Sequence, residues 1–153
     1  KGFGMRVIAN DIKNIRFKGI ELVSLKKLAL LSDIVSLHVH LNNKTQNLIN
    51  KDFFNRMKKD AIIINTARGK IINEEDLLSA LRKKDIAGAG LDVIDGEWLS
   101  DDKRSKHKLI KYSRTNENLI ITPHIGGSTK ESIENSRIFM AKKIVSFLKK
   151  LKK

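Results

Sequence analysis

The sequence predicts an α/β fold with a doubly wound, mostly parallel β-sheet that is incomplete on its N-terminal side. Short apolar blocks alternate with amphipathic segments of helical period along the chain. The blocks are continuously apolar, as in "AIII" at 61–64, which is typical of strands covered on both faces. Repeated strand–helix units favour parallel pairing through right-handed crossovers.

The elements follow from these patterns in chain order. Strands are expected over 5–10, 33–39, 61–67, 86–93 and 118–123, and helices over 24–32, 50–58, 73–84 and from 128 onward. Asn73 with Asp76 resembles a capping box, and Ser128 with Glu131 forms one in full. The polar segment 94–117 lacks clear periodicity, so we expect an irregular excursion there.

Composition excludes several classes of protein. Cysteine is absent, which excludes disulfides and thiolate metal sites, and no other metal site is predicted. No apolar run reaches the roughly 20 residues that span a bilayer, so we expect no membrane segment and a cytoplasmic location. The chain has 31 lysines and arginines and 17 aspartates and glutamates, so its net charge is +14. This excess of positive charge raises a nucleic-acid partner as an alternative. The basic residues are scattered, however, and phosphate binding needs charge gathered on one surface.

Polar side chains recur where the predicted strands end. Ligands of open parallel sheets bind beyond the carboxyl ends of the strands. Five polar residues fall at or just past such ends: Asp11, His38, Arg68, Asp92 and His124. We therefore expect one ligand crevice along this edge of the sheet.

Arg68 and His124 are candidate reactive residues. A guanidinium fork suits a carboxylate, and the small neighbours Ala67 and Gly69 would let a ligand approach closely. His124 stands between the only proline and a glycine pair, and histidine exchanges protons near neutral pH. The alternatives are a surface arginine at a strand end and a hydrogen-bonded structural histidine.

Two acidic residues complete the candidate set. Glu97, in "DGEWL", could pair with an imidazole and fix its tautomer, although Asp95 could compete and a solvated loop glutamate is the alternative. Asp11 stands at the end of the first strand, where, in a dinucleotide-binding fold, an acid hydrogen-bonds the adenosine ribose hydroxyls and repels a 2′-phosphate, which selects NAD over NADP. Lys13 and Arg16 close behind weaken that selection.

Together these features resemble a known family. The stretches "AIIINTARGKIINEEDLLSAL", "AGAGLDV" and "NLIITPHIGGSTKES" look like the NAD-binding domain of D-isomer-specific 2-hydroxyacid dehydrogenases, nearest to the D-3-phosphoglycerate dehydrogenase branch. The resemblance covers nearly all of the chain. It implies a Rossmann-like fold, with residues 1–153 forming a partial NAD-binding domain. The helix after residue 128 would return toward a missing substrate domain.

The resemblance also implies roles for individual residues. Arg68 would bind the substrate carboxylate, His124 would be the acid/base, and Glu97 would be its partner. The cofactor would be NAD and the substrate a D-2-hydroxy or 2-oxo acid, possibly 3-phosphoglycerate. The cofactor-binding residues would be Asp11, His38, Thr66, Ala67, Arg68, Asp92, His124, Gly126 and Gly127. The family is typically dimeric, so we also expect a homodimer.

Departures from the family pattern leave one alternative open. The glycine-rich turn that would meet the pyrophosphate is absent, and the chain is expected to begin after it. His40 and Trp98 stand where the family often has proline. We therefore expect the 153-residue chain alone to be inactive. The alternative function is an NAD-sensing interaction module of the same fold that turns over little or no substrate.

Overall fold

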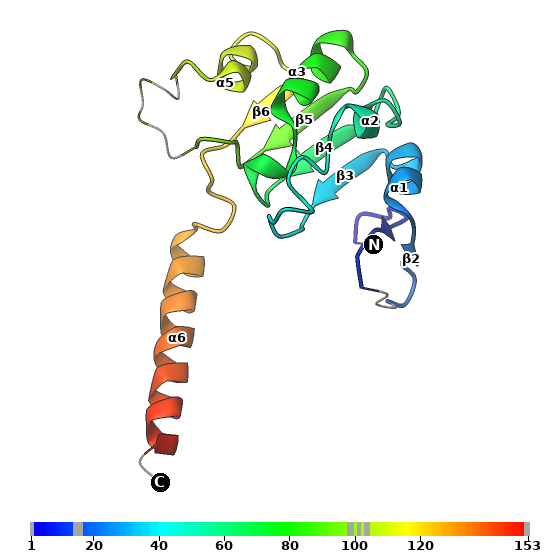
Figure 1. Ribbon diagram of the computed structural model, residues 1–153. Helices are drawn as coiled ribbons and strands as arrows, with labels where there is room; N and C mark the ends of the chain where they lie inside the picture. Colours follow the sequence, from blue (N-terminus) through cyan, green and yellow to red (C-terminus); the bar gives the residue numbers. More distant parts are fainter. Residues whose placement is uncertain (1, 14–16, 98–99, 101, 103–104, 152–153) are drawn as a thin grey trace.

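The computed structural model describes residues 2–13, 17–97, 100, 102 and 105–151 (Figure 1). The strands are β1 (Ile8–Ala9), β2 (Glu21–Leu22), β3 (Ile34–Leu37), β4 (Ile62–Asn65), β5 (Gly88–Leu91) and β6 (Leu119–Ile121). The helices are α1 (Leu25–Leu31), α2 (Lys51–Phe54), α3 (Glu74–Lys83), α5 (Lys108–Ser113) and α6 (Lys130–Leu151), with a short 3-10 helix η1 (Gly69–Ile71).

The described strands form two parallel sheets. Four of them pair side by side in the order β3-β4-β5-β6, and β1 pairs separately with β2. Every pairing is parallel, for example Val35 with Ile63 and Ile63 with Ala89. The predicted α/β architecture with a mostly parallel, Rossmann-like sheet is confirmed.

Helices cover only one face of the four-stranded sheet. Val35, Ile63 and Leu119 point to that face and are buried in a core shared with α2, α3 and α5. On the opposite face, Ile34 is 52% and Ile120 is 67% exposed. The expectation that both faces would be covered is therefore wrong for the described residues. The strands still carry apolar side chains on both faces, but none of the described helices covers the face that carries Ile34 and Ile120.

One of the two predicted helix starts is correct, and the other lies one residue away from its predicted position. The side chain of Asn73 accepts hydrogen bonds from the backbone amides of Glu75 and Asp76, so it caps α3 as expected. At α6 the predicted cap Ser128 is wrong by one residue. Thr129 Oγ1 accepts from the amide of Ser132 at 3.1 Å, because the helix begins at Lys130.

The described part of the segment 94–117 includes a helix that the sequence did not predict. It contains α5, whose N-cap His107 accepts from the amide of Leu109. The Leu109 side chain is buried and secures the helix to the core. Histidine is not a strong capping signal, so the pattern missed this helix. The predicted helix 50–58 is shorter than expected, and β2 is too short to give a detectable period.

Helix α6 extends away from the sheets as a separate arm (Figure 1). It carries exposed apolar side chains, including Phe139, Ile144 and Phe147. Its expected return toward a substrate domain stays a prediction. Among the described residues, no helix has the length and apolar character needed to cross a membrane.

Candidate active site

The carboxyl ends of the parallel strands meet along one edge of the sheet. The strands β1, β3, β4, β5 and β6 end just before Asp11, His38, Arg68, Asp92 and His124, respectively. For His38, Arg68, Asp92 and His124 this follows from the parallel pairing of β3, β4, β5 and β6, whose last residues lie at the same edge. Asp11 follows β1, which belongs to the separate two-stranded sheet.

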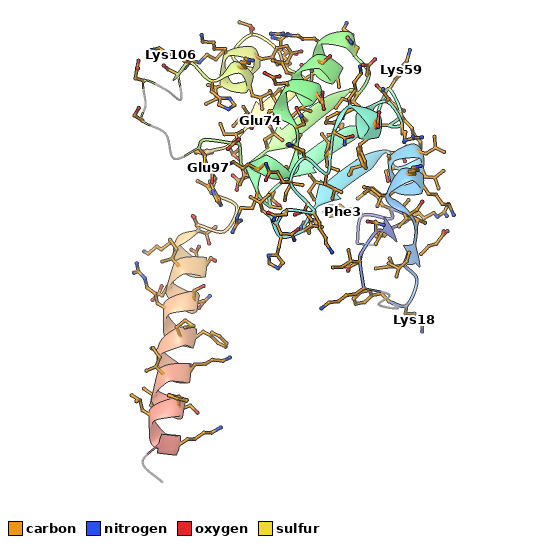
Figure 2. All side chains as sticks on the ribbon, viewed as in Figure 1. Phe3, Lys18, Lys59, Glu74, Glu97 and Lys106 are labelled. Carbon is orange, nitrogen blue, oxygen red and sulfur yellow. The ribbon has the colours of Figure 1, made fainter. Side chains whose placement is uncertain are left out.

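Glu97 and His124 are in direct contact at this edge. Glu97 Oε1 lies 2.9 Å from His124 Nδ1, although the two residues are 27 positions apart. Their side chains are 18% and 35% exposed, so the pair is partly shielded from water. Figure 2 places Glu97 beside the segment that joins β6 to α6. Asp95, the competing carboxylate, instead lies 3.8 Å from Lys70 Nζ.

The backbone of His124 is held in an uncommon conformation. Its φ of 54° lies in the left-handed region, which non-glycine residues seldom adopt. The His124 amide donates to the carbonyl of Thr122 at 3.0 Å. Such conformations persist only where the surroundings enforce them, and they cluster at functional sites.

Asp92 provides the enforcing contacts. Its Oδ1 accepts from Thr122 Oγ1 at 2.6 Å and from the amide of Ile125 at 2.9 Å. Its Oδ2 accepts from the amide of Gly126 at 2.8 Å. A Cβ at residue 126 would lie only 2.9 Å from that same oxygen, so the close approach requires glycine. One buried carboxylate thus fixes the loop on both sides of His124.

The charge of Asp92 is stabilised by these same contacts. Burial acts to raise its pKa, but the hydrogen bonds from Thr122, Gly126 and Ile125 and the nearby His124 together outweigh burial. The pKa of Asp92 consequently lies below its ordinary value. The carboxylate is therefore ionised at neutral pH.

A cavity of about 520 Å³ adjoins the Glu97–His124 pair. Its wall includes Asp92, Thr122 and the apolar side chains of Ile94, Ile110 and Ile121. Glu97 Oε2 is buried and accepts no hydrogen bond from the described residues. A buried acceptor without a donor is costly, so this oxygen marks a place where a further donor would be stabilising.

Arg68 lies at the neighbouring strand end, next to the loop that carries Glu97. Its Nη1 donates to the carbonyl of Ala67 at 2.6 Å, so the guanidinium folds back on its own backbone. The packing of Gly69 against Ile94 brings the arginine loop beside the start of the 94–97 segment. Arg68 is exposed and outside the wall of the cavity.

Asn65 is a site residue that the sequence reasoning missed. It is 1% exposed, its Nδ2 donates to the carbonyl of Arg68, and its Oδ1 accepts from the amide of Ala67. This buried amide shapes the turn that presents the arginine. The available signal was a polar residue at the end of the apolar run 61–64.

The remaining candidates are not among the groups that hold the Glu97–His124 pair in the hydrogen bonds described above, and two of them make local contacts of their own. Asp11 Oδ1 accepts from the amide of Lys13 at 2.8 Å. His38 Nε2 lies 2.8 Å from Ser36 Oγ, and Thr66 is exposed. Arg16 and Trp98, which the sequence analysis also considered, lie outside the described residues.

A parallel sheet with polar groups at the carboxyl ends of its strands has the arrangement of dinucleotide-binding domains. The family model "D-isomer specific 2-hydroxyacid dehydrogenase, NAD binding domain" matches residues 1–126, and the chain belongs to this family. The family prediction is thereby confirmed, as is NAD as the cofactor of its domain.

Individual relatives agree with this assignment. The chain is 38% identical to glyoxylate reductase of Korarchaeum cryptofilum over 96% of its own length and 43% of that protein. It is 39% identical to D-3-phosphoglycerate dehydrogenase 2, chloroplastic, of Arabidopsis thaliana, covering 97% of this chain and 23% of the relative.

A solved structure agrees as well. The NAD complexed form of a D-isomer specific 2-hydroxyacid dehydrogenase from Lactobacillus delbrueckii ssp. bulgaricus superposes with a TM-score of 0.89 at 32% identity. The match covers 97% of this chain and 47% of that one. The chain thus spans less than half the length of these relatives.

Proposed function

We propose that the complete protein is an NAD-dependent oxidoreductase that transfers a hydride between the nicotinamide and a D-2-hydroxy or 2-oxo acid. The observation that carries the proposal is the Glu97–His124 contact at the sheet edge. Family membership supports it, because the family is one of D-isomer specific 2-hydroxyacid dehydrogenases.

In this proposal Arg68 holds the substrate carboxylate. Its guanidinium is exposed and bonded only to a neighbouring carbonyl in the described contacts, so a carboxylate can replace that partner with a charge-assisted pair. Two parallel hydrogen bonds would fix the orientation of the acid. Fixing the reacting carbon relative to the cofactor is itself a large part of the rate enhancement.

His124 exchanges the proton. Because Nδ1 faces a Glu97 oxygen, that nitrogen carries the hydrogen and donates it to the carboxylate. The lone pair is then on Nε2, which takes the hydroxyl proton during oxidation. During reduction the imidazolium returns a proton to the ketone oxygen, and Glu97 stabilises its positive charge.

The residues present fit an NAD cofactor at two points. Asp11 Oδ1 receives the Lys13 amide, and Oδ2 receives no hydrogen bond from the described residues, so it suits the ribose hydroxyls. Asp92 Oδ2 accepts one described bond and has a lone pair for the carboxamide amide. A Cβ at residue 127 would meet nothing within 4 Å, so Gly127 lines open space. When bound, the nicotinamide accepts or supplies the hydride.

We also propose a homodimer and a cytoplasmic location for the complete protein.

The substrates to test are suggested by the relatives, which include a glyoxylate reductase, a hydroxypyruvate reductase and a D-3-phosphoglycerate dehydrogenase. Glyoxylate, hydroxypyruvate and 3-phosphohydroxypyruvate are therefore the first 2-oxo acids to test, followed by pyruvate.

The experiment is NADH oxidation by the complete protein with this panel of 2-oxo acids. The proposal expects saturable turnover with at least one acid. Association of the protein on adding NAD, without turnover of any acid, would instead support the sensing module. DNA retention that falls steeply with salt would support the nucleic-acid alternative.

A further inference from the structure

A second cluster of a histidine and two carboxylates lies outside the candidate reaction centre. Glu74 is the first residue of α3, Asp95 belongs to the segment that leads to Glu97, and His107 caps α5. None of the three has a role in the proposed proton transfer. Glu74 and Glu97 are both labelled in Figure 2.

Glu74 bridges the other two residues. Its Oε1 accepts from the backbone amide of Asp95 at 2.7 Å, and its Oε2 lies 3.1 Å from His107 Nε2. The same His107 nitrogen lies 3.1 Å from the carbonyl oxygen of Asp95. Glu74 and His107 therefore hold both the amide and the carbonyl of Asp95.

The hydrogen bonds of the ring define its tautomer. The amide of Leu109 donates to His107 Nδ1 at 3.3 Å, so Nδ1 carries no hydrogen. The hydrogen is then on Nε2, where it is directed at Glu74 and at the Asp95 carbonyl. A neutral imidazole satisfies all three contacts at once.

The cluster is shielded from water. The side chains of His107 and Glu74 are 14% and 19% exposed. Burial raises the pKa of Glu74, against the opposing effect of the bonds from Asp95 and His107. Hydrogen bonds in such surroundings fix geometry more firmly than exposed ion pairs do. The neighbouring pair of Glu75 and Lys108 is of the exposed kind, with side chains 78% and 70% exposed.

Asp95 is also confined from the opposite side. A Cβ built on Gly69 would lie 2.4 Å from the Asp95 backbone nitrogen, so the glycine is in close contact with this segment. Glu97 follows only two residues later. The contacts on Asp95 thus determine where the chain starts its approach to His124.

We propose that Glu74 and His107 are positioning residues that set the location of Glu97 relative to His124. The inference rests on the proposed function, in which Glu97 orients the imidazole. Removal of Glu74 should lower kcat, because Glu97 no longer holds His124 in a productive orientation. The KM for NADH should change little, since neither residue lies at the strand ends that would bind the dinucleotide.

The test compares Glu74→Ala with Glu74→Gln and Glu75→Ala in the complete protein. Glutamine keeps an acceptor for the Asp95 amide. Glu75 is a matched control, because it also lies in the first turn of α3 and also pairs with α5. Glu74→Ala should lower kcat about tenfold or more with KM for NADH within about twofold. Glu74→Gln should recover most of that loss, and Glu75→Ala should leave both constants within about twofold.

Hydrogen exchange at the Asp95 amide gives a readout that does not need turnover. Exchange should be faster in Glu74→Ala and in His107→Ala, and unchanged in Glu75→Ala. Unchanged exchange in both cluster variants would overturn the inference, as would faster exchange with an unchanged kcat. If the wild type turns over no 2-oxo acid, the proposed function fails, and the exchange measurement alone decides the positioning role. If Glu74→Ala does not fold, His107→Ala supplies both measurements.

Discussion

Gly69 packs directly against the backbone of Ile94. A Cβ built on Gly69 would lie 2.2 Å from the Ile94 carbonyl carbon and 2.5 Å from its oxygen. No side chain fits that space, so the contact depends on the glycine. It links the loop that carries Arg68 to the segment that carries Glu97, although the two residues are 29 positions apart in the sequence.

The first prediction follows from this contact. Gly69→Ala should move the two segments apart, lowering the free energy of unfolding by about 1–3 kcal/mol through overpacking. It should also lower kcat, since the positions of Arg68 and Glu97 relative to each other would change. Chemical denaturation and steady-state kinetics check both effects. Gly127→Ala, where a Cβ meets nothing within 4 Å, is the control and should leave stability almost unchanged.

The second prediction concerns the acid/base. His124→Ala in the complete protein should lower kcat by roughly 10²-fold or more, because the proton-transfer group is lost. NADH binding, followed by fluorescence titration, should persist. Near-normal turnover would exclude this role for His124.

The third prediction uses the lowered pKa of Asp92. A carboxylate whose folded pKa lies below its unfolded value stabilises the protein above the unfolded value, and this stabilisation is lost as pH falls through the folded pKa. The ordinary value is about 3.8. Thermal unfolding from pH 6 to below pH 3.8 should therefore show declining stability in the wild type.

Asp92→Asn is the matching variant. It lacks the ionisation, so its stability should be lower at pH 6 and should depend less on pH in the acid range. Equal acid dependence in the wild type and the variant would show that other carboxylates dominate. The variant should also lower kcat, because an NH2 group replaces one carboxylate oxygen and one of the Ile125 and Gly126 amides loses its acceptor.

The fourth prediction concerns cofactor choice. Asp11→Ser removes the charge expected to repel a 2′-phosphate while keeping a hydroxyl for hydrogen bonding. The ratio of kcat/KM for NADH to that for NADPH should fall by about tenfold or more, which is a change of roughly 1.4 kcal/mol in selectivity. An unchanged ratio would show that Asp11 does not face the adenosine ribose. Asp33→Ser, an exposed carboxylate paired with Lys58 before β3, is the control.

The sequence alone predicted most strands and helices and the edge of the sheet where most of the polar residues lie, but it missed β2 and α5. Apolar periodicity and capping signals depend on residues close together in the sequence, so they can be recognised before the packing is known. Asp11, His38, Arg68, Asp92 and His124 were placed at strand ends for this reason, and parallel pairing aligns the last four in one sheet.

Tertiary structure decided the contacts between distant segments. Three sets of contacts depend on how separate segments pack. They are the pairing of Glu97 with His124, the three hydrogen bonds from the 122–126 loop to Asp92, and the hydrogen bond from buried Asn65 to the carbonyl of Arg68. It also decided that the described helices pack on one face of the four-stranded sheet, while Ile34 and Ile120 on the other face are exposed. These features depend on close approach between residues far apart in the chain, and a one-dimensional pattern does not encode such distances.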